Sequence, residues 1–121
     1  MATLTGKLQL SSSDLLSQNL SLSVSDSFTV SEGGIEKKSI TPTVSGSAVT
    51  IAVAADYTVG TYIYLKNTDS LNSDKVFIRI SSADQIVLEG GEWAFFPWST
   101  DADISAYATT TGTLLEIGIF S

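Results

Sequence analysis

The chain has 121 residues, the usual size of one domain, and it contains neither cysteine nor histidine. These absences exclude a disulfide framework, a thiolate or histidine metal site, and any catalytic triad that uses histidine. Thirteen acidic residues against six basic ones give a net charge of −7, which disfavours nucleic acid and anionic membranes as partners. No apolar run approaches the roughly 20 residues that cross a bilayer, so no membrane segment is predicted.

The first strand with a clear pattern is predicted over residues 20–30. Apolar side chains occupy every second position and hydroxyl side chains fill the positions between them, with only Asp26 interrupting the apolar row. A period of two indicates a strand with one buried and one solvated face. Residues 3–10 alternate in part, so we interpret the segment 1–19 as an N-terminal arm or an edge strand.

Glycine-rich and polar turns separate the remaining predicted strands. Residues 32–34 predict a hairpin turn that leads from the first strand into a strand over 35–44. A turn rich in Asn and Asp predicts a second hairpin, between strands over 61–66 and 75–81. Further short strands are expected over residues 48–53, 86–88, 104–108 and 113–120.

About eight or nine short strands at spacings of about ten residues indicate an all-β fold. We predict one domain over residues 1–121, an antiparallel β-sandwich with the topology of a jelly roll or a related Greek key. This architecture suppresses exposed sheet edges and suits evenly spaced short strands. An immunoglobulin-like sandwich is the nearest alternative.

The most apolar segment is an aromatic corner over residues 93–98. In an extended strand Trp93 and Phe95 share one face while Phe96 and Trp98 share the other, so a single core can bury only one of the two faces. The strand can be central in a two-layer fold, or Pro97 can bend it so that Trp98 covers an open sandwich end. Alternatively all four aromatics belong to a protein interface, with Phe96 and Trp98 as its anchors. Stacking on a sugar ring is a third interpretation, which lacks a nearby polar cluster to support it.

The acidic residues give no convincing catalytic or metal site. Glu89 and Glu92 flank two glycines and could form a glycosidase-like pair, but a solvated turn explains them better. Five aspartates could supply oxygens to calcium, although their spacing lacks the pattern of a dedicated site: Asp69, Asp74, Asp84, Asp101 and Asp103. The sequence therefore predicts a protein that is not an enzyme and that needs no metal and no cofactor.

Three segments carry a resemblance to a known class of proteins. An aromatic strand over 62–66, the turn 66–70 (KNTDS) and the corner 91–98 (GEWAFFPW) precede a final apolar strand. This order resembles small virion structural proteins of tailed bacteriophages, especially marine cyanophage-like ones. The resemblance implies a non-enzymatic protein of the virion, made in the host cytoplasm. Among such roles it favours a capsid decoration or cement protein on the head lattice, with the major capsid protein or other virion proteins as partners.

Two further expectations concern assembly. The aromatic corner is apolar on both faces, so we expect a homo-oligomer, a dimer or a trimer, that covers the face which the core leaves exposed. The alternative function is a head or tail fibre or receptor-binding module that recognises carbohydrate on the host surface. An enzyme acting on polysaccharide is disfavoured by the absence of histidine and of a convincing carboxylate pair.

Overall fold

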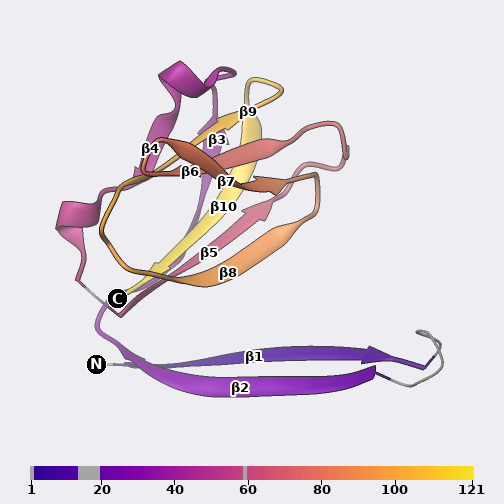
Figure 1. Cartoon of the computed structure of the whole chain (residues 1–121), viewed down its shortest axis with the longest axis vertical. Coiled ribbons are helices and arrows are strands. Elements are labelled where there is room, and N and C mark those ends of the chain that lie inside the picture. Colours follow the sequence, from indigo (N-terminus) through magenta and orange to yellow (C-terminus); the bar gives the residue numbers. More distant parts are fainter. Residues whose placement is uncertain (1, 14–19, 59) are drawn as a thin grey trace. The chain divides into compact units, whose positions relative to one another are not determined.

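The chain divides into two compact units. The computed structural model describes residues 2–13, 20–58 and 60–121, and Figure 1 shows its strands. Met1–Glu32 form the first unit, which we call the hairpin unit, and Gly33–Ser121 form the second, which we call the body.

The hairpin unit contains two long antiparallel strands. β1 (Ala2–Ser12) pairs with β2 (Leu20–Val30) in a continuous register that runs from Ala2 opposite Val30 to Ser12 opposite Leu20. The strand predicted over residues 20–30 is therefore confirmed. The arm predicted over 1–19 includes β1, whereas its residues 14–19 lie outside the described part of the chain.

The two faces of the hairpin differ in chemistry. One face carries pairs of apolar side chains, namely Leu4 with Phe28, Leu8 with Val24 and Leu10 with Leu22. The other face carries polar pairs such as Thr5 with Ser27 and Gln9 with Ser23. The predicted burial of the apolar row is wrong for its outer part, because Leu22 is 41% exposed and Val24 is 54% exposed. A sheet of two strands has no second layer in its own unit that could cover this face.

The body is an antiparallel β-sandwich. Its strands are β3 (Ile35–Ile40), β4 (Val49–Ala52), β5 (Thr61–Asn67), β6 (Val76–Ile80), β7 (Ala83–Leu88), β8 (Trp93–Trp98), β9 (Ile104–Ala108) and β10 (Thr113–Phe120). They form two four-stranded sheets with the orders β3-β10-β5-β8 and β4-β9-β6-β7. Two short 3-10 turns, η1 (Ser45–Ser47) and η2 (Ala54–Asp56), flank β4. The predicted all-β sandwich is thus confirmed.

Alternating side chains build the core of the body. Along β5 every second residue is buried and the residues between them are only half-buried. The same alternation in β9 and β10 places one apolar face of each sheet inward. The largest fully buried apolar side chains are Ile40, Ile63, Leu65, Val76, Ile78, Ile104, Leu115 and Ile117. The hydrophobic core cluster found among the described residues lies wholly in the body.

Neither of the two predicted hairpins forms. β5 pairs with β10 and β8, whereas β6 pairs with β7 and β9, so the turn between β5 and β6 carries the chain from one sheet to the other. β3 pairs with β10 rather than with β2, so residues 32–34 connect the two units instead of two paired strands. Turn composition predicted where the chain bends but not which strands pair.

A buried amide explains the crossing from β5 to β6. Asn67, the last residue of β5, has no exposed surface. Its Nδ2 donates hydrogen bonds to the backbone carbonyls of Asp74 and Leu88, at 2.6 and 2.9 Å, and its Oδ1 accepts one from the backbone N–H of Asp69 at 3.0 Å. Asp74 leads into β6 and Leu88 ends β7, so one side chain joins the two sheets.

The turn before β8 packs against the turn that follows Asn67. The backbone N–H of Asn67 donates to the carbonyl of Glu92 at 3.0 Å, and the N–H of Gly91 donates to the carbonyl of Asn67 at 2.8 Å. Gly90 has no room for a side chain, because an added Cβ would overlap the backbone carbonyl of Leu71. We call this set of contacts around Asn67, Gly90, Gly91 and Glu92 the Asn67 junction.

Replacing the central amide should destabilise the body. Asn67→Ala removes three hydrogen bonds and leaves the carbonyls of Asp74 and Leu88 buried without that donor, so we expect the free energy of unfolding to fall by about 2–4 kcal/mol. Urea denaturation followed by circular dichroism measures this loss. The control is Asn72→Ala, in an exposed turn position of the same loop, which should change the free energy by no more than about 0.5 kcal/mol. Equal effects of the two changes would contradict the role of the junction.

Candidate interaction surfaces

The aromatic corner forms β8, an edge strand whose two faces have different environments. Trp98 is only 4% exposed, and its indole N–H donates to the backbone carbonyl of Ala102 at 3.1 Å. Its ring lies 5.7 Å from that of Tyr57, and Phe96 packs against the same core. The core of the body therefore takes the face that carries Phe96 and Trp98.

The opposite face of β8 remains accessible. Trp93 is 57% exposed and Phe95 is 38% exposed. Phe96 and Trp98 were expected to anchor an interface, but in the folded body Trp98 is buried and Phe96 is half-buried against the core. Trp93 and Phe95 are the members of the predicted set that a partner can reach.

Neighbouring strands surround these two aromatics with a mixed outer surface. Trp93 lies opposite Lys66 on β5, and Lys66 lies opposite Glu116 on β10. Two register positions along, on the same face, Phe95 lies opposite Tyr64, whose hydroxyl donates to Glu116 Oε1 at 2.9 Å. Burial raises the pKa of Tyr64, and the adjacent Glu116 carboxylate raises it further. This face of the β3-β10-β5-β8 sheet thus combines exposed aromatic rings with charged groups.

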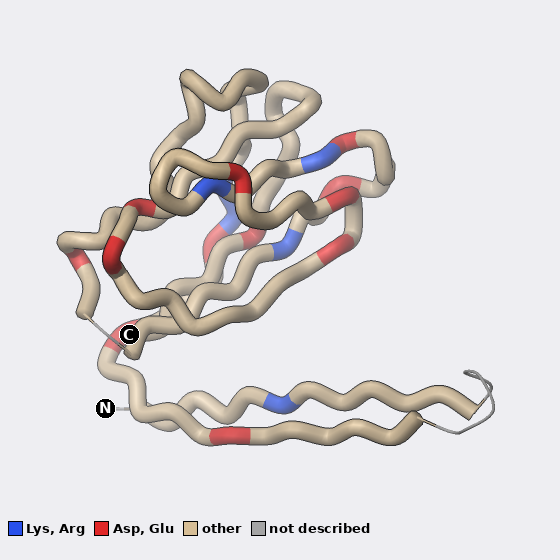
Figure 2. The backbone as a smooth tube through the Cα atoms, in the orientation of Figure 1, with Lys and Arg blue, Asp and Glu red and all other residues tan. Residues whose placement is uncertain are grey.

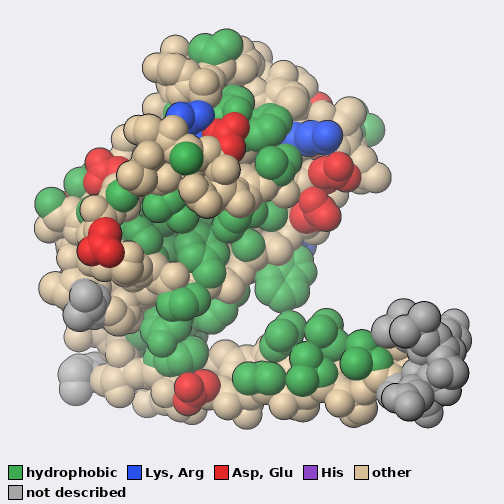
Figure 3. Space-filling view, viewed as in Figure 1, with side chains coloured by type: hydrophobic (Ala, Val, Ile, Leu, Met, Phe, Trp, Pro, Cys, Tyr) green, Lys and Arg blue, Asp and Glu red, His purple; other side chains and the backbone are tan. Residues whose placement is uncertain are grey.

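A second accessible surface lies on the hairpin unit. Five large apolar side chains on one face are between 38% and 54% exposed: Leu8, Leu10, Leu20, Leu22 and Val24. We call these five residues the hairpin patch, and Figure 3 shows hydrophobic side chains along this part of the chain. Within β1 and β2 the charged residues are Lys7 and Asp26 (Figure 2). The hairpin patch is therefore apolar, exposed and nearly free of charge.

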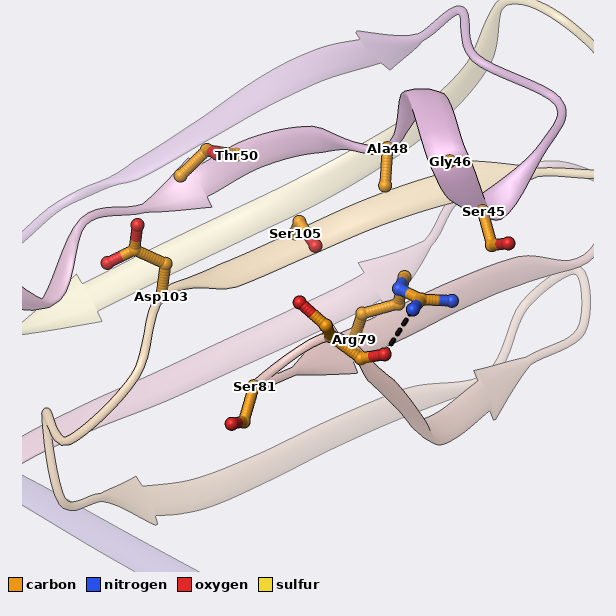
Figure 4. Close-up of a pocket in the computed structure, with 9 residues that line it drawn as sticks. Ser45, Gly46, Ala48, Thr50, Arg79, Ser81, Asp103 and Ser105 are labelled. Atoms are coloured by element: carbon orange, nitrogen blue, oxygen red, sulfur yellow. Dashed lines mark hydrogen bonds between the residues drawn. The ribbon is translucent and has the colours of Figure 1, made fainter.

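A third feature is a polar pocket on the outer side of the β4-β9-β6-β7 sheet. Its volume is about 530 Å³, and Figure 4 shows the residues that line it. Five of these residues carry hydroxyl groups: Ser45, Thr50, Ser81, Ser82 and Ser105. Arg79 and Asp103 supply the charged groups of the lining.

Hydrogen bonds hold Arg79 in place at this pocket. Its Nη1 lies 2.9 Å from Asp84 Oδ1, and its other terminal nitrogen donates to the backbone carbonyl of Ser82, the bond drawn in Figure 4. The hydroxyl of Tyr107 donates to the second oxygen of Asp84 at 2.7 Å, and this bond raises the pKa of Tyr107. The sequence did not predict this cluster, because Tyr107 joins Arg79 and Asp84 only through the pairing of β9 with β6.

Most of the carboxylates considered for chemistry are engaged in hydrogen bonds or ion pairs within the body. Glu92 Oε1 accepts a hydrogen bond from the backbone N–H of Glu89 at 2.7 Å, and Glu89 lies 3.8 Å from the Lys75 ammonium. Asp103 Oδ1 accepts from the backbone N–H of Ala54 at 2.8 Å, and Asp74 accepts from a threonine hydroxyl. Within residues 2–13, 20–58 and 60–121, acidic side chains form no group of three or more that could hold a metal ion.

Comparison with known proteins adds no relative. The chain matches no protein-family model, no curated protein and no solved structure. In the described part of the chain, no helix has the length and apolar character needed to cross a membrane. Functional inference therefore depends on the sequence and on the three surfaces described above.

Truncation of the two tryptophans of β8 should change the free energy of unfolding by very different amounts. Trp98→Ala removes a large buried ring and should lower the free energy of unfolding by about 3–5 kcal/mol. Trp93→Ala removes an exposed ring and should change it by no more than about 0.5 kcal/mol. Chemical denaturation of both variants, followed by far-ultraviolet circular dichroism, separates these outcomes. A larger loss for Trp93→Ala than for Trp98→Ala would show that the assignment of the two faces is reversed.

Proposed function

We propose that this chain is a non-enzymatic structural protein of a tailed-bacteriophage virion, and that it decorates or cements the capsid lattice. The observation that carries the proposal is the hairpin patch, an exposed apolar surface on a unit outside the hydrophobic core cluster. The resemblance of residues 62–98 to small virion proteins supplies the phage context.

The energetics of the hairpin support an assembly role. An isolated two-stranded hairpin is marginally stable in water, and a sheet with one apolar face normally needs a second layer. The 11 residues of each strand extend for about 37 Å, so one face of the hairpin covers roughly 370 Å². The hairpin patch occupies part of this face, and apolar patches of a few hundred Å² on soluble proteins are often functional. In this proposal, a neighbouring virion protein is the second layer that covers the apolar face of the hairpin.

The topology of the body is consistent with such a role. Its first strand pairs with its last, β4 with β9, β5 with β8 and β6 with β7, so the pairs are nested. We infer from this nesting that the body is a jelly roll, an architecture found in viral capsid domains. Both sheets contribute to one core, so in this proposal the body folds by itself and only the hairpin needs a partner.

The charge distribution favours attachment by apolar contact. The net charge of −7 opposes binding to packaged nucleic acid, and β1 and β2 together carry only Lys7 and Asp26. Ion pairs at exposed sites contribute little free energy in any case. Burial of leucine and valine side chains is therefore the main source of binding free energy in this proposal.

Polar substitution within the hairpin patch should weaken attachment. Leu10 and Leu22 lie opposite each other on the apolar face, and replacing both with Ser removes buried apolar area from the contact. We expect the affinity for phage heads that lack the chain to fall at least about tenfold, as measured by co-sedimentation. The matched control replaces Gln9 and Ser23, the next pair along and on the polar face, with Ala.

The control should bind as the wild type does, and both variants should retain the thermal unfolding of the body. Equal binding of the Leu10/Leu22 variant and the wild type would contradict attachment through the hairpin patch. Loss of binding in the control alone would assign the contact to the polar face.

Attachment should be nearly insensitive to salt. Screening weakens charge pairs, whereas apolar burial is unchanged or slightly strengthened by added salt. Raising sodium chloride from about 0.1 to about 0.5 M should change the bound fraction less than about twofold. Release of the wild-type chain over this range would show that electrostatic contacts carry the attachment.

A further inference from the structure

We propose that the polar pocket of the β4-β9-β6-β7 sheet is a binding site for a neutral saccharide. This proposal concerns a different surface from the hairpin patch and does not depend on the role in the virion. It agrees with the alternative function expected from the sequence, recognition of carbohydrate on a host surface.

The pocket exists because small side chains form its floor. Thr50 on β4 and Ser105 on β9 are small cross-strand neighbours on the outer face of the sheet, and the longer Arg79 on β6 lies opposite Ser105. Ala48 and Gly46 extend the floor with even smaller residues. The volume of about 530 Å³ lies within the range of sites for small ligands.

The lining provides both donors and acceptors of hydrogen bonds. A hydroxyl group can donate one hydrogen bond and accept others, as each hydroxyl of a sugar also can. The lining combines five such groups with the Asp103 carboxylate, which accepts, and the Arg79 guanidinium, which donates. This mixture matches a polyhydroxylated ligand better than one that offers only acceptors.

The electrostatics of the pocket favour an uncharged ligand. The guanidinium of Arg79 is already paired with Asp84, and Asp103 adds a second carboxylate on the pocket side. The nearby groups thus carry no excess of positive charge, and the chain as a whole carries −7. An anionic ligand would meet a repulsive field.

The turn between β6 and β7 contains an unusual backbone conformation. Ser81 and Ser82 both adopt left-handed conformations, with φ values of 58° and 63°. Turns of this kind prefer Asn and Gly, so two consecutive serines are unfavourable for the backbone. Both residues line the pocket. Hydrogen bonding of their hydroxyl groups to a ligand would explain why the strained backbone is retained.

An aromatic pair adjoins the polar groups on the same face of the sheet. The rings of Phe77 and Tyr107 are stacked, with centroids 4.7 Å apart. These residues lie opposite each other in the register, two positions from the Arg79 and Ser105 pair and therefore on the same face. An apolar flank next to hydrogen-bonding groups suits a pyranose, which has both apolar C–H faces and polar edges.

Nuclear magnetic resonance titration tests the site directly. We would add neutral disaccharides at millimolar concentration, namely maltose, lactose, cellobiose and N,N′-diacetylchitobiose, to the full-length ¹⁵N-labelled chain. At least one of them should shift the amide signals of Ser81, Ser82 and Ser105 and the Nε–H signal of Arg79. Thr50→Tyr should raise its dissociation constant at least about tenfold, because the ring fills the pocket.

Ser39→Tyr is the matched control, because Ser39 is an exposed hydroxyl residue on β3, the edge strand of the other sheet. It should leave the dissociation constant unchanged. Absence of shifts with all four sugars, shifts confined to Trp93 and its neighbours, or unchanged binding by Thr50→Tyr would each overturn the proposal. Tighter binding of a sulfated disaccharide than of its neutral parent would overturn the assignment of an uncharged ligand.

Discussion

A single buried amide, that of Asn67, joins the two sheets of the body at one end. Its three side-chain hydrogen bonds fix the turn after β5 against the ends of β6 and β7, and its backbone fixes the turn before β8. Because β8 then starts at a set position, the alternation of a strand sends Trp93 outward and Trp98 into the core. The packing of the core and the composition of one outer face both depend on this junction.

The distribution of apolar side chains separates the tasks of the two units. The body buries the inward faces of its sheets in one core, whereas the leucines and valine of the hairpin patch lie outside that core cluster. The exposed apolar surface of the hairpin and the hydroxyl-rich pocket beside Arg79 differ in chemistry and lie on different units. The two proposals therefore concern separate surfaces and can be tested independently.

Alternation in the sequence predicted the strands and the fold class well, because side-chain periodicity is a local property. The pairing of strands was predicted poorly, since Asn67 resembles any turn asparagine until its long-range partners Asp74 and Leu88 are known. The sequence predicted that the core buries only one face of the strand 93–98. It did not show whether that face carries Trp93 and Phe95 or Phe96 and Trp98. The pocket had no local signal, because Thr50, Arg79 and Ser105 become neighbours only through strand pairing.

Hydrogen exchange on the full-length chain tests most directly the claim that the hairpin lacks a core of its own and is stabilised by a partner. In dilute solution without particles, amides of β1 and β2 should exchange at least about 100-fold faster than the paired amides of β5 and β10. Addition of phage heads should slow exchange in β1 and β2 and leave β5 and β10 unchanged. Equal protection of the hairpin and the body in the free chain, with no change on adding heads, would contradict the account.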